Sequence, residues 1–231
     1  MKTYVYIKYT LDFICALILL VVTSWIMLLC ALAIKLDDQS APVMYNALRF
    51  GKGLKPFKMY KFRTMKTAFE GVGRVSQETL TRPGKALRKM SLDELPQLVN
   101  ILRGEMSFVG PRPLTERYVP WYTKDQNRRH NVRPGLTGLA QVNGRVNLGW
   151  DKRFMYDVQY VENQSILNDL KIIIATIQKT VMGEDTLVGE GTGAFDYFDD
   201  FQKEQIARHI VREADLIDWR SSVGKLNEVR Q

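Results

Sequence analysis

Two adjacent carboxylates, Asp93 and Glu94, lie in the basic stretch RKMSLDELPQLVNILRGEMSFVGPRP at residues 88–113. Arg88 and Arg112 flank this acidic pair. A carboxylate pair among guanidinium groups suits a phosphorylated substrate that is held through a divalent cation. One carboxylate can attack phosphorus while the other holds the metal, and the arginines neutralise the transferring group. The pattern therefore indicates phosphoryl-transfer chemistry.

The residues around this dyad predict the start of a helix. Apolar side chains recur at helical spacing through Leu92, Leu95, Leu98, Val99 and Leu102. Pro96 lacks an amide hydrogen and is best tolerated in a first helical turn. The dyad is therefore expected at the helix N-terminus, where free amides and the macrodipole favour anions.

A purely structural interpretation of the dyad stays open, because Ser91 and Glu94 also have the spacing of a capping box. The arginine that follows favours the chemical interpretation. In the segment GPRP at residues 110–113, prolines on both sides restrict the backbone near Arg112. A rigid phosphate clamp requires this kind of restriction.

Composition restricts the partners that this chain can have. The 231 residues are enough for one domain with a sizeable core, and 45% of them are hydrophobic. The formal net charge of +8 favours an anionic partner, which is nucleic acid, acidic lipid or a phosphorylated substrate. Because the basic residues never form a run of five or more, nucleic acid is the weakest of these, and we expect no nucleic-acid partner.

Any bound metal is expected to have oxygen ligands. The histidines and cysteines of the chain are His130, His209, Cys15 and Cys30, without the spacing of a metal site or the proximity along a helix for a disulfide. Oxygen ligands favour Mg²⁺, with Mn²⁺ as the alternative, over zinc. Asp93 and Glu94 are the expected metal ligands.

Residues 13–34 contain no charge and no proline. At about 1.5 Å per helical residue, this segment is long enough to cross a hydrocarbon core of roughly 30 Å. It is too long for a cleaved signal peptide, and no small-residue cleavage site follows it. Asp12 at its start and Lys35 at its end are expected to mark the interfacial limits of this segment.

Residues 41–50 and 57–65 predict two strands of a β-hairpin, joined by a glycine turn at residues 51–53. The second strand carries Lys58 and Lys61, and Arg63 follows them. These side chains suit contact with phosphate or lipid headgroups, although an ordinary solvated strand face fits the local pattern equally well.

Three later segments have recognisable patterns. The motif RPGLTGLAQVNGR at residues 133–145 predicts a tight, glycine-rich loop that can approach a nucleotide or sugar. Residues 166–181 predict an amphipathic helix in the headgroup plane. Residues 206–217 predict one more amphipathic helix.

The motifs SLDELPQLVNILRGEMSFVGPRP, KMYKFRTMK and RPGLTGLAQVNGR closely resemble those of the bacterial sugar transferase family. These enzymes are monotopic phosphoglycosyl transferases, and the resemblance covers roughly residues 5–185. It implies transfer of sugar 1-phosphate from a nucleoside diphosphate sugar, usually a UDP-sugar, to undecaprenyl phosphate, with release of UMP. This reaction is the first membrane step of polysaccharide and glycoconjugate synthesis, including exopolysaccharide and lipopolysaccharide.

The resemblance also implies roles for individual residues. Asp93 matches the family nucleophile, which forms a phosphosugar–aspartyl intermediate in a two-step route, and Glu94 matches the neighbouring metal-associated carboxylate. The expected binders of substrate or phosphate are Lys61, Arg63, Arg88, Arg112, Arg133 and Arg145. Magnesium is the expected cofactor.

The family's membrane helix is often broken by a Ser-Pro pair, so that it enters and leaves on the cytoplasmic face. This chain has Ser24-Trp25 at that place. Thr23 and Ser24 can bend a helix by bonding to the preceding turn, so we favour re-entrance, and a straight span stays open. Lys2 and Lys35 allow both ends to remain cytoplasmic.

The sequence thus predicts a mainly helical α+β fold with an N-terminal re-entrant membrane helix, interfacial amphipathic helices and a small β-hairpin. We expect a membrane-inserted region at 1–36, a cytoplasmic catalytic domain at 37–185 and a C-terminal extension at 186–231. The expected location is the bacterial inner membrane, with membrane lipids and downstream glycosyltransferases as further partners. A catalytically inactive family member and an anionic-lipid-binding scaffold are the alternatives.

Overall fold

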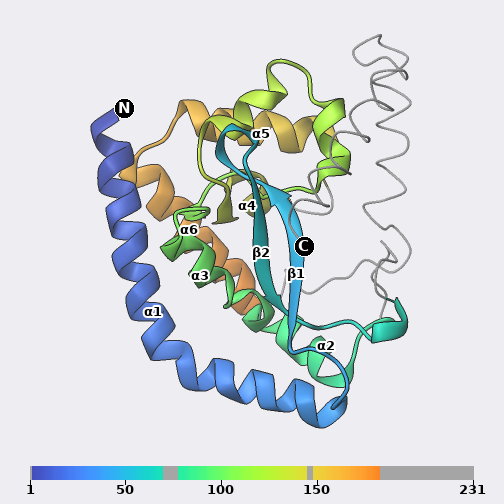
Figure 1. Ribbon diagram of the computed structural model, residues 1–231. Coiled ribbons are helices and arrows are strands. Elements are labelled where there is room, and N and C mark those ends of the chain that lie inside the picture. The colour runs from blue at the N-terminus through green and yellow to red at the C-terminus, as the bar shows by residue number, and fades with distance from the viewer. Residues whose placement is uncertain (1, 70–77, 145–147, 183–231) are drawn as a thin grey trace.

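The computed structural model describes residues 2–69, 78–144 and 148–182 (Figure 1). The long helix α1 is followed by a hairpin, a second small sheet and further helices. The helices are α1 (Lys2–Asp37), α2 (Arg82–Lys89), α3 (Gln97–Leu102), α4 (Leu139–Val142), α5 (Trp150–Glu162) and α6 (Ile166–Met182). The strands are β1 (Met44–Phe50), β2 (Pro56–Phe62), β3 (Ser107–Val109) and β4 (Gly135–Thr137). These elements confirm the mainly helical α+β fold.

Five 3-10 turns connect these elements. They are η1 (Lys52–Leu54), η2 (Thr67–Phe69), η3 (Leu92–Glu94), η4 (Glu116–Trp121) and η5 (Gln126–Asn131). The turns η4 and η5 pack beside α5, around an aromatic cluster of Tyr118, Trp121, Trp150 and Phe154. The predicted helix of residues 206–217 lies outside the described residues.

Strands β1 and β2 form the predicted antiparallel hairpin, with Phe50 opposite Pro56 and Met44 opposite Phe62. Alternation explains this arrangement, because Phe57 and Met59 are buried while Lys58 between them is exposed. The buried face packs on α3, and α3 in turn packs on α1. The helix that follows the dyad therefore lies between the hairpin and the apolar N-terminal helix (Figure 1).

Strands β3 and β4 form a two-stranded parallel sheet, in which Ser107 pairs with Gly135 and Val109 pairs with Thr137. The glycine-rich segment of residues 133–145 was predicted to be non-helical, and this prediction is wrong at α4. Gly138 has an extended backbone and immediately precedes α4. This glycine therefore lies at the helix boundary and does not interrupt the helix. The four residues that follow it, LAQV, are compatible with one helical turn.

Helix α1 is bent partway along its length (Figure 1). Near its middle, Thr23 Oγ1 donates to Leu19 O at 2.7 Å and Ser24 Oγ donates to Val21 O at 2.7 Å. Hydroxyl bonds of this kind bend helices without proline. The segment Tyr4–Asp37 has a mean hydropathy of 2.8 in its most apolar window, which is only 11% buried, and is long enough to cross a membrane.

The start of α1 is joined to the rest of the domain by a buried polar cluster. Lys8 pairs with Asp169 of α6, and Asp12 Oδ2 accepts from Ser107 Oγ at 2.6 Å. We call this group the α1–α6 cluster; its members are Tyr4, Lys8, Asp12, Ser107, Tyr160 and Asp169. Asp12 is 6% exposed and therefore faces the domain and not water. That it marks a limit of the membrane segment stays a prediction.

The end of α1 contacts the same domain. Cys30 and Ile34 pack with Phe62 at the end of β2 and with Leu87 of α2. Beyond them, Lys35 Nζ donates to Gln39 O and Ala41 O at 2.9 and 2.8 Å. Both ends of the long helix are therefore docked on one domain, while the apolar middle leaves many side chains exposed.

Helix α6 has the predicted amphipathic character. Ile172 on its inner face is 2% exposed and belongs to a core with Val109 and Tyr160. Its outer face exposes Ile166, Leu167, Leu170, Ile174, Ile177 and Met182. An exposed apolar stripe of this kind suits the interface between water and hydrocarbon.

Candidate active site

The dyad lies on η3, a short turn that leads directly into α3. Pro96 immediately precedes α3, as expected for a residue without an amide hydrogen. Ser91 has a left-handed backbone with φ +54° and makes no side-chain cap, so the capping box is not formed. Asp93 is 2% exposed, although a carboxylate is costly to bury without compensating charge.

Lys61 supplies that charge from the end of β2. Its Nζ lies 2.7 Å from Asp93 Oδ2 and 3.2 Å from Glu94 Oε1. The contact with Asp93 is an ion pair without hydrogen-bond geometry, whereas the contact with Glu94 is also a hydrogen bond. One ammonium group therefore bridges both carboxylates.

Asn100 of α3 fixes the strand that carries Lys61. Its Oδ1 accepts from Tyr60 N at 3.0 Å, and its Nδ2 donates to Lys58 O at 2.7 Å. Asn100 is completely buried, so these bonds connect α3 and β2 without competition from water. The helix behind the dyad and the strand that carries Lys61 are thereby held in one register.

Arg112 reaches Glu94 from the loop after β3, and its Nη2 lies 3.2 Å from Glu94 Oε1. Two backbone bonds hold this loop: Gly110 N donates to Thr137 O at 2.9 Å, and Gly135 N donates to Pro111 O at 3.0 Å. A Cβ atom on Gly135 would lie 2.1 Å from Gly110 N. In the structure, the glycine-rich motif therefore lets two backbone segments meet beneath Arg112.

The two cations set the protonation of Glu94. Burial alone would raise the pKa of this carboxyl group, but Lys61 and then Arg112 outweigh burial and lower its pKa to about 2. Glu94 is therefore ionised at neutral pH. An ionised carboxylate is the form that can hold a divalent cation.

Arg88 is the third basic group of the site. Its Nε donates to Thr64 Oγ1 at 2.8 Å. Burial lowers the pKa of Arg88, while the charges of Asp93 and Glu94 act in the opposite direction. Arg88 therefore lies within electrostatic reach of both carboxylates.

Two further arginines near this site were not predicted. Burial lowers the pKa of Arg49 and of Arg153, and the charge of Arg112 contributes to the lowering in each case. Arg49 is on β1, and Arg153 is on α5 with its guanidinium over the Trp150 ring at 4.5 Å. Neither residue belongs to a punctuated motif, so the sequence carried no local signal for them.

Residues 3–183 match the bacterial sugar transferase family. The Bacillus subtilis (strain 168) protein named "uncharacterized sugar transferase EpsL" is 45% identical over 77% of this chain and 89% of that relative. The UDP-glucose:undecaprenyl-phosphate glucose-1-phosphate transferase of Klebsiella pneumoniae is 40% identical over 73% of this chain and 38% of that enzyme. The Caulobacter vibrioides enzyme of the same name is 39% identical over 74% of this chain and 68% of its own length. This chain belongs to the bacterial sugar transferase family.

In this sugar transferase, the structure brings together four of the predicted site residues through direct contacts: Asp93, Glu94, Lys61 and Arg112. Arg133 lies elsewhere, with its guanidinium 3.8 Å from the centre of the Tyr9 ring of α1 and beside Gly104. Arg145 lies outside the described residues. The contacts of Arg133 join the domain to α1.

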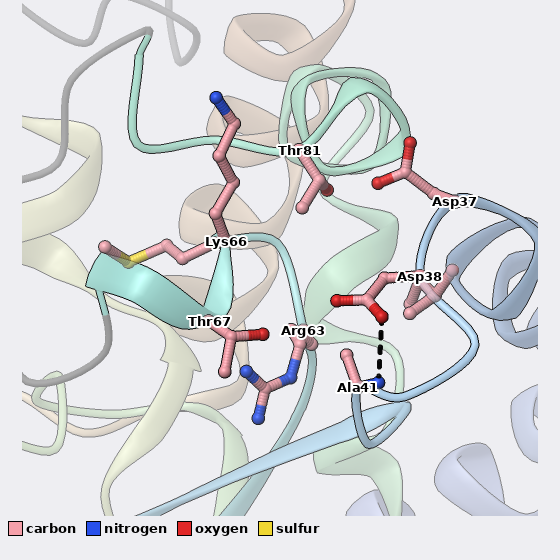
Figure 2. Close-up of a pocket in the computed structure, with 9 residues that line it drawn as sticks. Asp37, Asp38, Ala41, Arg63, Lys66, Thr67 and Thr81 are labelled. Carbon is pink, nitrogen blue, oxygen red and sulfur yellow. Dashed lines mark hydrogen bonds between the residues drawn. The ribbon is translucent and has the colours of Figure 1, made fainter.

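Arg63 lines a separate small pocket near the end of α1, together with Asp37, Asp38 and Thr81 (Figure 2). Its Nε donates to Pro42 O at 2.9 Å, and the residue is 6% exposed. β2 ends at Phe62, so Arg63 no longer shares the strand alternation that directs Lys61 toward the dyad. The structure therefore separates two basic residues that the sequence grouped together.

Asp93 and Glu94 are the residues of this sugar transferase that could hold a metal ion at the site. Among the residues that the structure describes, no group of three or more His, Cys, Asp or Glu side chains has metal-site geometry. Magnesium commonly uses one or two carboxylates together with substrate phosphate oxygens, rather than a cage made by the protein alone. The dyad fits that kind of donor set.

Proposed function

We propose that this sugar transferase moves sugar 1-phosphate from a UDP-sugar to undecaprenyl phosphate and releases UMP. One observation carries the proposal: the buried Asp93 and its neighbour Glu94 lie against Lys61 and Arg112. Two carboxylates framed by cations suit an anionic phosphoryl donor. The names of the Klebsiella and Caulobacter relatives support the same substrate classes.

The first step uses Asp93 as the nucleophile. A carboxylate oxygen of Asp93 attacks the β-phosphorus of the UDP-sugar and forms a new P–O bond. The bond between that phosphorus and the bridging oxygen breaks, and its electron pair leaves with UMP. The product is a phosphosugar joined to Asp93.

The second step returns Asp93 to its starting form. A phosphate oxygen of undecaprenyl phosphate attacks the same phosphorus, and the bond to Asp93 breaks. The product is undecaprenyl diphosphate sugar. Donor and product each contain one phosphoanhydride, so the exchange needs no other energy source.

The neighbouring residues stabilise charge in both steps. Lys61 and Arg112 bind and neutralise the phosphate oxygens of the group that is transferred. Asp93 and Glu94 would hold Mg²⁺ together with phosphate oxygens, which neutralises the diphosphate before attack. Before substrate binds, Lys61 orients Asp93 through the 2.7 Å ion pair.

The membrane arrangement that fits this reaction is a re-entrant α1. Its start is joined to the domain through Lys8 and Asp169, and its end packs through Ile34 against Leu87. A straight span would carry one of these ends away from the domain surface. The bend and both docked ends therefore support re-entrance on the cytoplasmic face of the inner membrane, with α6 alongside at the interface.

An assay of UMP release tests the proposed function. The purified chain in detergent is mixed with a panel of UDP-sugars, with and without undecaprenyl phosphate. We expect catalytic UMP release only with the lipid phosphate and one or a few donors. EDTA should abolish turnover, and added Mg²⁺ should restore it.

The outcomes of this assay separate the alternatives. An inactive family member or a lipid-binding scaffold would release no UMP from any UDP-sugar, and that result would contradict the proposed reaction. Full turnover in metal-free, EDTA-treated enzyme would contradict only the metal role of the dyad.

A further inference from the structure

Arg129 is a buried arginine that the reaction described above does not use. It lies on η5 and is 3% exposed. Its Nε and Nη2 lie 2.9 and 2.8 Å from Asp157 Oδ2, and its Nη1 donates to the Tyr122 hydroxyl at 3.0 Å. The guanidinium also lies 5.7 Å from the centre of the Phe154 ring.

One bond of Arg129 points toward the active site. Its Nη2 donates to the backbone carbonyl of Arg112 at 2.6 Å. Pro111 and Pro113 have no N–H groups, so this loop has few backbone donors of its own. Its carbonyl groups therefore depend on donors from elsewhere: Gly135 N reaches Pro111 O, and Arg129 reaches Arg112 O.

The shape of the guanidinium explains why an arginine is used at this position. Its planar, forked donors contact Asp157, Tyr122 and the Arg112 carbonyl in different directions at once. A lysine ammonium keeps the charge but cannot reproduce this fixed set of directions. Asp157 is 4% exposed and compensates the buried charge.

We infer that Arg129, held by Asp157 and Tyr122, is a positioning residue for Arg112. It fixes the backbone from which the Arg112 side chain reaches Glu94, 3.2 Å away. The kinetic part of this inference rests on the proposed function, because Arg112 is assigned there to the phosphates of the donor. Arg129 itself touches no reacting atom.

Arg129→Lys tests the inference, with Arg128→Lys as the matched control. Arg128 is the neighbouring residue, has a side chain that is 42% exposed, and pairs with Asp125 and Glu162. We expect Arg129→Lys to raise the KM for the UDP-sugar about tenfold with a much smaller change in kcat, because a charged contact to the donor is weakened. Arg128→Lys should leave both constants at the wild-type values.

A double-mutant cycle with Arg112→Ala distinguishes positioning from a general structural role. If Arg129 acts through Arg112, then Arg129→Lys should change kcat/KM less than about twofold in the Arg112→Ala background. The same tenfold loss in both backgrounds would overturn the inference. If the lysine variant does not fold, Tyr122→Phe replaces it in the cycle, because this change removes one partner of Arg129 and retains the ring.

Amide hydrogen exchange gives a readout without substrate. The N–H of Gly135, which donates to Pro111 O in the loop that carries Arg112, should exchange faster in Arg129→Lys than in wild type or Arg128→Lys. Faster exchange in a protein that releases no UMP would support the positioning role while contradicting the proposed function. Unchanged exchange and unchanged KM in an active enzyme would overturn only the positioning role.

Discussion

The dyad site and the α1–α6 cluster each place two carboxylates against one lysine, and they differ in the groups that supply the remaining donors. At the dyad, the additional donor in contact with Glu94 is the charged guanidinium of Arg112. In the α1–α6 cluster, the additional donors are hydroxyls that remain neutral. They belong to Tyr4, Ser107 and Tyr160.

The dyad site is also more exposed to solvent than the α1–α6 cluster. The side chain of Arg112 is 47% exposed, whereas the side chains of Lys8 and Asp169 are 5% and 10% exposed. Burial and then Asp169 raise the pKa of Tyr160, so its hydroxyl stays a proton donor at all ordinary pH values. One cluster has cationic groups that solvent or an anion can reach, and the other is closed by neutral donors.

This difference teaches how the same residue types serve two purposes. Extra positive charge beside two carboxylates prepares a site for a phosphorylated ligand. Neutral donors around a buried lysine and its carboxylates satisfy hydrogen bonds without attracting an anion. Substitution of a carboxylate should therefore mainly lower activity at the dyad site and mainly lower stability in the α1–α6 cluster.

Asp93→Asn is expected to have the largest effect. The change keeps the shape of the side chain but removes the attacking oxygen anion, so UMP release should fall by at least about 10³-fold. The fold should survive, because Lys61 retains Glu94 as a partner at 3.2 Å. Intact-mass measurement after mixing with donor alone should detect a phosphosugar adduct on the wild type and none on the variant.

Asp125→Asn is the matched control for this prediction. Asp125 is exposed and pairs with Arg128 on the surface, so its substitution should leave both the adduct and the turnover intact. An adduct of equal amount on Asp93→Asn would remove Asp93 from the role of nucleophile.

The topology of α1 gives the next prediction. If the α1–α6 cluster holds the start of the helix on the side of the catalytic domain, a cysteine added before Lys2 stays in the cytoplasm. A membrane-impermeant thiol reagent should then fail to label it in intact cells that express a Cys15- and Cys30-free background. Labelling after the cells are opened is the control. Modification in intact cells would mean that α1 spans the membrane.

The sequence was sufficient for features that depend on local pattern. The alternation in β2 predicted the hairpin, and Pro96 together with the apolar spacing predicted where α3 begins. The pairing of Asp93 with Glu94 in a basic stretch also identified the candidate site. In each of these cases, neighbouring residues carry the signal.

Features that depend on distant residues could not be read from the sequence in the same way. Lys8 and Asp12 are spaced for one helix face, but Lys8 pairs with Asp169 and Asp12 accepts from Ser107, 161 and 95 residues away in the sequence. The sequence therefore carried no sign that both charges are buried against the domain. Lys61 and Arg63 also looked equivalent. The end of β2 between them directs only Lys61 to the dyad.

Asp169→Asn should lower stability and retain activity, which is the opposite of the effect expected for Asp93→Asn. Lys8 would lose its closest partner and keep only Asp12, whose Oδ2 is 3.9 Å away. Breaking a buried ion pair on one side is expected to lower the free energy of unfolding by about 3 kcal/mol. Chemical unfolding in detergent measures this loss, and Asp125→Asn, which removes only a surface pair, should change it by less than about 1 kcal/mol.

Activity at low temperature completes this comparison. Under conditions where Asp169→Asn remains folded, its kcat should stay near the wild-type value, because the α1–α6 cluster shares no residue with the dyad site. Stability equal to the wild type together with a large fall in kcat would mean that the two clusters do not divide their tasks in this way.

The smallest predicted effect concerns a buried group outside both clusters, His130. Its Nδ1 lies 3.2 Å from Gly51 O, next to the turn that joins β1 and β2. Burial and then Arg129 lower the pKa of His130 to about 3, from an ordinary value of 6.5. Between these values the unfolded chain binds a proton that the folded chain does not. Stability should therefore fall as pH falls through this window, by at most about 1.4 kcal/mol per pH unit from this group.

Glu94 titrates in a lower window, so the two groups can be separated. Its folded pKa of about 2 lies below the ordinary 4.5, so its stabilising contribution is complete above pH 4.5 and is lost as pH falls toward 2. His130→Asn can still donate to Gly51 O, and between pH 6.5 and 5 it should lose about 1.6 kcal/mol less stability than the wild type. Glu94→Gln should follow the wild-type slope over that range. Parallel unfolding curves for the wild type and His130→Asn would contradict this account, because they would mean that His130 titrates alike in the folded and unfolded chains.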